Sequence, residues 1–240
     1  MPLLQSTPLH PILYSFRRCP YAMRARFAIA IADQACELRE VVLRDKPAEL
    51  LAAFSDVPDF PQDGKATVPV LIDRDGRVIA QSLDIMLWAL QRHDPGQWLQ
   101  PAHGTLDDML ALIARCDGDF KQQLDRYKYP ARQPGIDASA PADHRAQAAH
   151  FLDLLNQRLR ATRYLFGARV ALADMAIAPF VRQFAQVDAA WFAAQPWLAL
   201  QGWLAALTGS ALWLAATHKV PPWKTGEAGI AFRLPAPGLS

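Results

Sequence analysis

The sequence predicts an α/β domain followed by an all-α domain. Strand-like and helix-like segments alternate up to residue 92, and only helical periodicity is found in the segments after residue 105. Between them, the Pro- and Gly-containing stretch 93–105 is typical of a linker. We therefore expect domains at 1–92 and 106–240. The second should end in an irregular tail, because residues 221–240 show no helical period.

The first domain shows the signals of a mixed sheet with helices packed against it. Residues 20–33 place apolar side chains on one helical face. Asp75–Gly76 is a strong hairpin signal, and Ser82 is a good N-cap residue. A βαβ unit implies parallel strands and a hairpin adds an antiparallel pair, so a four-strand, thioredoxin-like arrangement is predicted. The expected strands are 11–16, 36–43, 67–73 and 78–80, and the expected helices are 20–33, 49–54 and 82–93.

The second domain is predicted to be a helical bundle. Its segments repeat apolar residues at helical spacing, and polar, Pro-rich sequence separates the first two. The expected helices are 106–127, 142–162, 172–185 and 197–209.

Charge and hydropathy exclude several classes of protein. The net charge is +2, and Lys and Arg are spread among Asp and Glu without a long basic block. Nucleic-acid binding therefore has little support. The N-terminus lacks a basic region followed by an apolar core, and no apolar run approaches the roughly 18–20 residues of a membrane span. We expect a cytoplasmic protein without a membrane partner.

The three cysteines, Cys19, Cys36 and Cys116, are far apart and odd in number. This is not a disulfide framework, and it fits a reducing compartment. No histidine lies two to four residues from a cysteine, so these residues do not form a metal-ligand pair. No metal is expected.

Cys19, in "FRRCPYAMR", lies where the first strand ends and the first helix begins. Pro20 suits the first helical position. N–H groups at the helix start would favour a thiolate, and Arg17 and Arg18 would add positive potential. Such features lower the pKa of a thiol from about 8.5 toward roughly 3.5–7.5. The alternative is a buried cysteine that only packs, which is the interpretation we give to Cys36 and Cys116.

The segment "CPYA" has no second cysteine three residues after the first. An internal disulfide cannot form there, so a mixed disulfide at Cys19 would have to be passed to an external thiol. This favours a small-thiol partner over a dithiol oxidoreductase.

Two further stretches could complete a site. Pro69 interrupts an expected strand; a cis Val68–Pro69 bond would present the Val68 backbone toward Cys19, although X–Pro bonds in general favour trans. Ser82 begins a helix, so its hydroxyl and nearby N–H groups can hold a carboxylate. Gln81 offers an acceptor for an ammonium group. The alternative for Ser82 is a plain helix cap.

In combination, the "CPYA" turn, "TVPVL" and "QS" at a helix start resemble the glutathione transferase superfamily. "RRCPYAMRAR" and "SLDIMLWAL" are similar to segments of omega-like bacterial members. The resemblance covers nearly the whole chain. It implies a thioredoxin-fold domain that binds glutathione, a helical domain that shapes a second-substrate pocket, and a homodimer.

The resemblance also implies site residues. Cys19 would be the catalytic thiol, and Lys46 would approach the glycine end of glutathione. Val68 would pair with the glutathione backbone, and Pro69 would be cis. The γ-glutamyl end would be bound by Gln81 and Ser82. Phe120, Tyr127 and Trp223 could face the second-substrate pocket, although aromatic residues at helical spacing are more often part of a core.

Three positions depart from the pattern of this family. Gln81 stands where omega-like members usually have Glu, which weakens an ammonium contact. Residues about 55–64 look inserted next to the proposed peptide site. Ala171 replaces the hydroxyl residue of a capping box and leaves Asp174 to cap alone, at a cost of about 1 kcal/mol.

The sequence therefore predicts a glutathione-dependent thiol transferase or reductase, with glutathione as cosubstrate and a small disulfide or electrophile as second substrate. One alternative is conjugation of glutathione to electrophiles, for which Tyr14 or Ser15 would have to stabilise the glutathione thiolate. Another is a non-catalytic glutathione- or ligand-binding protein, which Gln81 would favour and the intact "CPYA" would not.

Overall fold

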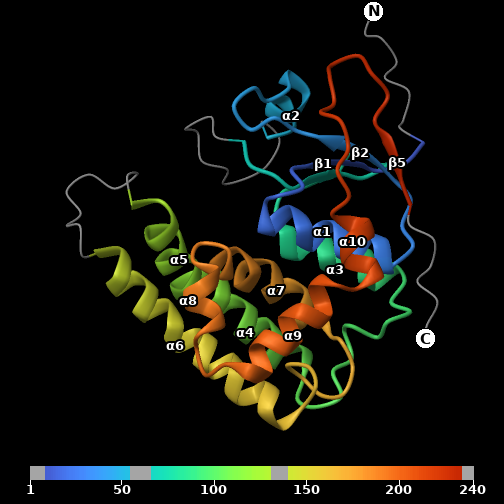
Figure 1. Ribbon diagram of the computed structural model, residues 1–240. Coiled ribbons are helices and arrows are strands. Elements are labelled where there is room, and N and C mark those ends of the chain that lie inside the picture. The colour runs from blue at the N-terminus through green and yellow to red at the C-terminus, as the bar shows by residue number, and fades with distance from the viewer. Residues whose placement is uncertain (1–8, 55–65, 131–139, 234–240) are drawn as a thin grey trace, which may run out of the picture. The chain divides into compact units, whose positions relative to one another are not determined.

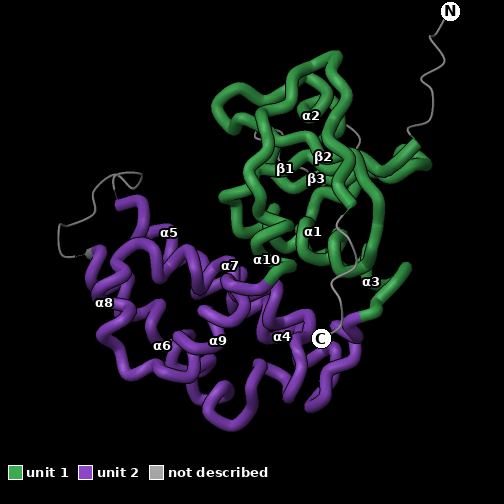
Figure 2. The backbone as a smooth tube through the Cα atoms, turned by 45° about the vertical axis from the view of Figure 1, so that its right-hand side comes forward, with its two compact units in different colours: residues 1–95, 211–240 green, residues 96–210 purple. Residues whose placement is uncertain are grey.

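The computed structural model describes residues 9–54, 66–130 and 140–233 (Figure 1). The chain forms two compact units, one of residues 1–95 with 211–240 and the other of residues 96–210 (Figure 2). The boundary between residues 95 and 96 falls inside the expected linker, 93–105. The structure differs from the expected domain 106–240 at the C-terminal end, because residues after 210 belong to the first unit.

The first unit contains a mixed five-strand sheet in the order β4-β3-β1-β2-β5. Its central pair, β1 and β2, is parallel, and the other neighbours are antiparallel. The thioredoxin-like fold class is thereby confirmed, with one more strand than the four expected. The strands are β1 (Ile12–Ser15), β2 (Cys36–Glu40), β3 (Val70–Ile72), β4 (Val78–Ile79) and β5 (Ile230–Phe232).

The added strand, β5, comes from the tail that the sequence predicts to be irregular. It pairs with β2 and so covers an edge that would otherwise expose unpaired backbone groups. The Gly229 N–H donates to Glu37 Oε1 at 3.0 Å. A Cβ on Gly229 would lie 2.5 Å from Glu37 Cγ, so only glycine allows this close approach.

Helix α1 (Pro20–Ile31) is the buried helix of this unit. Every residue in it except Tyr21 is buried, because the sheet, α3 (Ser82–Arg92) and α10 (Ala211–Ala216) surround it (Figure 1). Phe27 packs against Trp213 of α10 with ring centroids 4.7 Å apart. A helix buried on all sides needs no single apolar face. The short α2 (Ala48–Ala53) lies on the other side of the sheet.

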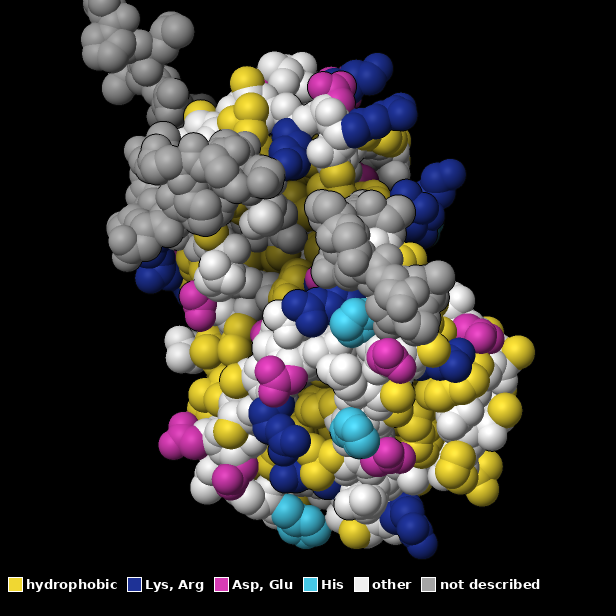
Figure 3. Space-filling view, turned by 90° about the vertical axis from the view of Figure 1, so that its left-hand side faces the viewer, with side chains coloured by type: hydrophobic (Ala, Val, Ile, Leu, Met, Phe, Trp, Pro, Cys, Tyr) yellow, Lys and Arg dark blue, Asp and Glu magenta, His cyan; other side chains and the backbone are white. Residues whose placement is uncertain are grey.

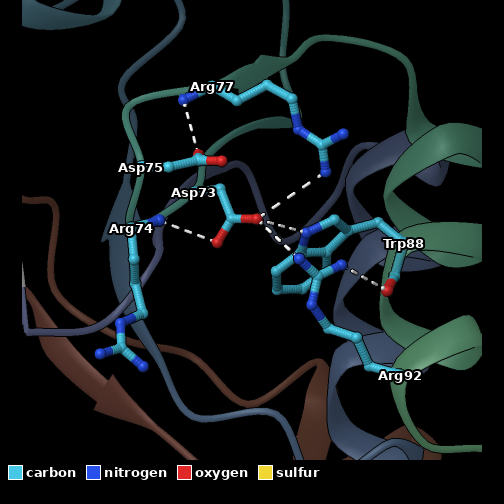
Figure 4. A network of polar contacts seen from close by, with 6 residues as sticks. All are labelled: Asp73, Arg74, Asp75, Arg77, Trp88 and Arg92. Atoms are coloured by element: carbon cyan, nitrogen blue, oxygen red, sulfur yellow. Dashed lines mark hydrogen bonds and ion pairs between the residues drawn. The ribbon is translucent and has the colours of Figure 1, made fainter.

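Asp73 ties the β3–β4 hairpin to α3 (Figure 4). Its Oδ2 accepts from Trp88 Nε1 at 2.7 Å and from Arg92 Nη2 at 2.8 Å, and its Oδ1 accepts from the Arg74 N–H at 2.8 Å. Burial acts to raise the pKa of Asp73, but these hydrogen bonds and the neighbouring arginines outweigh it and hold the pKa below its ordinary value. The network fixes the end of the sheet opposite to Cys19, because β3 runs antiparallel to β1.

The second unit is helical. The helix expected at 106–127 is interrupted at Gly118, whose φ of −85° and ψ of −106° are not helical, and a π-helical turn, η1, lies there. No described helix in either unit is long and apolar enough to cross a membrane. The helices of this unit are α4 (Leu106–Arg115), η1 (Cys116–Phe120), α5 (Lys121–Lys128), α6 (Ala140–Ala161), α7 (Leu172–Ala185), α8 (Ala189–Ala193) and α9 (Leu198–Thr208).

Surface charge is mixed in sign. On the face shown in Figure 3, Lys and Arg side chains are interspersed with Asp and Glu. This distribution agrees with the small net charge of the chain.

Asp174 caps α7 alone, as the sequence predicts. Ala171 has no side-chain oxygen, and Asp174 Oδ2 accepts from the Ala171 N–H at 2.9 Å. Asp174 Oδ1 accepts from the Leu165 N–H at 2.9 Å and from Trp203 Nε1 at 2.8 Å. The carboxyl group is fully buried. Burial raises the pKa of Asp174 to about 6 in spite of these bonds.

Asp174→Asn should change how stability depends on pH. The folded protein binds the Asp174 proton more tightly than the unfolded chain, since the pKa rises from 3.8 to about 6 on folding. The stabilisation is therefore complete below about pH 4 and is lost as the pH rises through about 6. The free energy of unfolding of wild type should fall relative to the variant by about 1–3 kcal/mol over this interval. Urea denaturation of both proteins at about pH 4 and above pH 6 measures this change. A difference in free energy of unfolding that does not depend on pH would contradict the raised pKa of Asp174.

Candidate functional site

Cys19 is the N-cap residue of α1, with φ −78° and ψ 123°. Its N–H donates to the Phe16 carbonyl at 2.9 Å, and its own carbonyl accepts from the Met23 N–H at 3.0 Å. Pro20 is the first helical residue, as expected. The Cys19 side chain is half-buried. The thiol thus lies at the positive end of the helix dipole and remains accessible.

Cys36 and Cys116 differ from Cys19 in being buried, at 2% and 0% exposure. None of the three cysteines is in a disulfide. Burial raises the pKa of Cys36 to about 12. A thiol with that pKa is protonated at neutral pH and is a poor nucleophile. The two cysteines that we interpreted as packing residues therefore provide an internal comparison for Cys19.

The turn before Cys19 is held by Glu40, a residue that is not part of any motif in the sequence. Glu40 Oε1 accepts from the Arg17 N–H at 2.8 Å, and Oε2 pairs with Arg26 Nη2. Arg26 also donates from Nε to Ser15 Oγ at 2.8 Å and from Nη1 to the Ala216 carbonyl at 3.3 Å. Glu40 and Arg26 are 6% and 0% exposed. One buried ion pair therefore connects the end of β1, the Cys19 turn, β2 and α10.

The other arginines of this stretch have separate roles. Arg18 is exposed, and its guanidinium lies 5.1 Å from the centre of the Phe16 ring. Arg24 is fully buried, with Nη1 3.5 Å from Ser82 Oγ and its guanidinium 5.5 Å from the Tyr21 ring. Arg24 thus connects the helix that begins at Cys19 with the start of α3.

The loop before β3 brings Val68 to Cys19. The Val68 carbonyl oxygen is 3.6 Å from Cys19 Sγ, although the two residues are 49 positions apart. The Val68–Pro69 peptide bond is cis, as the family resemblance implies. Pro69 immediately precedes β3 and so does not interrupt its ladder.

Gln81 and Ser82 lie at the start of α3. Gln81 is the N-cap residue, so the cap is one position before the expected Ser82. Its carbonyl accepts from the Ile85 N–H at 3.0 Å, and its side chain is exposed. Ser82 is the first helical residue and is 6% exposed. Its hydroxyl oxygen lies 3.5 Å from Nη1 of the buried Arg24, which belongs to α1.

Lys46 lies just before α2 and is half-buried. Leu50 of α2 packs in a hydrophobic cluster that also contains Tyr14, Val68 and Trp223, and Cys19 packs against this cluster. The expected insertion at about 55–64 lies outside the described residues.

The aromatic residues expected at a second-substrate pocket are buried. Phe120 is 2% exposed and packs against Phe151 and Phe184, with ring centroids 5.0 and 5.9 Å apart. Tyr127 is 9% exposed and lies 5.4 Å from the Phe184 ring. These are the core contacts typical of aromatic residues at helical spacing. Trp223 lies in the first unit, whereas the sequence placed it in the helical domain.

The hydroxyl groups nearest to Cys19 in the sequence are also buried. Tyr14 is 1% exposed, and its hydroxyl accepts from Arg39 Nη1 at 2.7 Å. Burial raises the pKa of Tyr14, and Arg39 opposes this rise. Ser15 is fully buried and accepts from Arg26. Neither hydroxyl is presented to solvent. Among the described residues, no cluster of three or more His, Cys, Asp or Glu residues could hold a metal ion.

Comparison with protein families matches both halves of the chain. Residues 13–98 match the family described as "Glutathione S-transferase, N-terminal domain", and residues 96–216 match "Glutathione S-transferase, C-terminal domain". A comparison with curated protein sequences finds no match.

Solved structures with a similar fold include glutathione transferase Omega 3C from Trametes versicolor, with 19% identity, a TM-score of 0.69, and coverage of 89% of this chain and 91% of that chain. A glutathione transferase family member from Pseudomonas fluorescens, with two glutathione bound, has 15% identity, a TM-score of 0.70, and coverage of 88% and 94%. A glutathione transferase from Burkholderia graminis, with two glutathione molecules per subunit, has 19% identity, a TM-score of 0.69, and coverage of 88% and 89%. At these identities the likeness shows the fold.

Glu40→Ala should destabilise the protein far more than loss of an exposed ion pair. It leaves the buried Arg26 charge uncompensated and the Arg17 N–H without its acceptor. The expected loss in free energy of unfolding is about 3–5 kcal/mol. The control is Arg233→Ala, which removes the solvent-exposed pair with Asp33 and should leave the free energy of unfolding nearly unchanged. Equal losses in chemical denaturation would contradict the role of Glu40.

Proposed function

Because the chain belongs to the glutathione S-transferase superfamily, we propose that it is a glutathione-dependent thiol transferase or reductase with Cys19 as its nucleophile. The observation that carries the proposal is the place of Cys19. It is a half-buried thiol at the N-cap of α1, and its sulfur is 3.6 Å from the Val68 carbonyl oxygen. A cysteine at a helix N-terminus is favoured as thiolate, the attacking species in thiol exchange.

The proposed reaction exchanges one disulfide for another in two steps. The Cys19 thiolate attacks the glutathione sulfur of a glutathionylated substrate, and the substrate thiolate leaves. Cys19 is then bonded to glutathione. The thiolate of a second glutathione attacks the glutathione sulfur of this mixed disulfide, which forms glutathione disulfide and restores the Cys19 thiolate. The absence of a second cysteine in "CPYA" requires the external thiol in this second step.

Glutathione binding is proposed at the residues implied by the family. Val68 would offer its backbone to the cysteinyl part of glutathione after Pro69 sets the loop, and Lys46 would meet the glycine carboxylate. Gln81 and Ser82 would hold the γ-glutamyl end, where the N–H groups at the start of α3 favour a carboxylate. Buried Arg24, whose Nη1 is 3.5 Å from Ser82 Oγ, adds positive charge behind this position. The two bacterial relatives with bound glutathione support the ligand class.

The conjugation alternative is less well supported by the site. It needs a hydroxyl that stabilises the thiolate of glutathione itself. Tyr14 and Ser15 are buried and already bonded to Arg39 and Arg26. A non-catalytic binding protein would retain the fold without needing an accessible Cys19. We also propose that the protein is a homodimer, as the family implies, and that it is cytoplasmic.

Cys19→Ser should abolish thiol transfer and retain glutathione binding, because a serine hydroxyl without a base is a far poorer nucleophile than a thiolate. The measurements are reduction of a glutathionylated peptide and, in parallel, conjugation of an aryl halide. Cys36→Ser is the matched control, since Cys36 is buried and protonated, and it should keep transfer activity.

Transfer activity that persists in Cys19→Ser would overturn the mechanism. Conjugation that exceeds transfer in wild type and survives in Cys19→Ser would favour the conjugating alternative. Glutathione binding without either activity would favour the binding protein.

A further inference from the structure

The C-terminal segment 211–233 runs from α10 to β5 alongside the sheet that carries the candidate site (Figure 1). It belongs to the first unit although some 190 residues separate it from the Cys19 turn. Its first connection to that turn passes through Glu40. The Trp223 N–H donates to the Glu40 carbonyl at 2.8 Å, and the Glu40 carboxylate accepts from Arg17. The residue that holds the turn is therefore itself held by the C-terminal segment.

The Trp223 side chain is fixed in one orientation. Its Nε1 donates to the Glu227 carbonyl at 2.8 Å, and the Arg39 guanidinium lies 4.3 Å from its ring centre. The Trp223 and Tyr14 rings pack edge to face, with ring centroids 6.0 Å apart. Only 9% of Trp223 is exposed. A buried tryptophan with its N–H bonded and a cation on its face is a structural anchor.

The indole ring packs in the cluster that lies under the proposed glutathione-binding loops. Val68, before β3, and Leu50, from α2, are members of this cluster, and Cys19 packs against it. A second bond connects the same segment to α2, because Thr225 Oγ1 donates to Glu49 Oε2 at 3.0 Å. The C-terminal segment thus supports both chain segments with these proposed glutathione contacts, Val68 before β3 and Lys46 before α2.

We propose that Trp223 is a positioning residue for glutathione binding, which acts through Val68 and α2. This inference rests on the proposed function of the site. Removal of the indole would leave a void in the cluster that contains Val68 and Leu50, and both segments would lose packing that helps to fix their backbones. The Cys19 backbone would be less affected, because it is held by the hydrogen bonds to Phe16 and Met23 and by the turn at Glu40.

Substitution of the Trp223 side chain tests the contribution of the indole ring separately from that of the backbone hydrogen bond. Trp223→Ala and Trp223→Phe both keep the N–H that donates to Glu40. The matched control is Trp213→Phe, in the same segment, where a tryptophan of 3% exposure packs on Phe27 of α1. Each variant is compared with wild type by calorimetric titration with glutathione and by the rate at which iodoacetamide alkylates Cys19 without glutathione.

Trp223→Ala should weaken glutathione binding by at least about tenfold, and Trp223→Phe should restore part of the affinity. Trp213→Phe should stay within about twofold of wild type, and the alkylation rate of Cys19 should change by less than about threefold in all three variants. This separation of affinity from thiol reactivity distinguishes positioning of the ligand loops from general loss of structure.

Unchanged affinity in the Trp223 variants would overturn the inference and leave the proposed function intact. An equal loss in Trp213→Phe would also overturn it, since the effect would then be one of overall stability. If Trp223→Ala does not fold, the test rests on Trp223→Phe. We expect this variant to bind glutathione about threefold more weakly than wild type, and Trp213→Phe not to show this weakening. If wild type itself does not bind glutathione, both the proposed function and this inference are wrong.

Discussion

The buried ion pair between Arg26 and Glu40 is the interaction on which the candidate site depends. Removing two charges from water is costly, and their mutual attraction offsets that cost only when further hydrogen bonds satisfy both groups. Here they do. Arg26 also donates to Ser15 and to the Ala216 carbonyl, and Glu40 also accepts from the Arg17 N–H. The pair therefore specifies the relative positions of β1, α1, β2 and α10.

The geometry at Cys19 follows from this constraint. With Arg17 fixed to Glu40, the chain leaves β1 in a turn that makes Cys19 the N-cap residue of α1. Buried α1 then fixes the direction of the helix dipole, and the loop at Val68 approaches the sulfur to 3.6 Å. The fold thus presents one thiol at a helix N-terminus and keeps the other two in the interior.

Local sequence signals predicted the parts of the structure that depend on nearby residues. The βαβ order, the Asp75–Gly76 hairpin and the start of α1 at Pro20 are set within a few positions, and the structure contains them. Strand β5 was missed because it forms only by pairing with β2, which is distant in the sequence. Residues 211–233, which the sequence placed with the helical domain, belong to the first compact unit for the same reason.

The supporting residues of the site were also hidden in the sequence. Arg24 and Arg26 look like the polar face of a helix, and Glu40 looks like the exposed side of a strand, yet all three are buried. The hydrogen bonds from Arg24 and Arg26 to Ser82, Ser15 and Ala216 span 58, 11 and 190 positions, and no periodic pattern encodes such pairings. Cys19 was predictable because its neighbours in the chain, Pro20 above all, determine its helix-start position.

Peptide mapping after incubation with glutathione disulfide tests whether Cys19 is the reactive thiol. We expect one glutathionyl group, on the peptide that contains Cys19, and its release by excess glutathione. Cys36 and Cys116 should remain unmodified in the folded protein, because both are buried. An unmodified Cys19, or modification of the other two cysteines at the same rate, would show that Cys19 is not the reactive thiol of this protein.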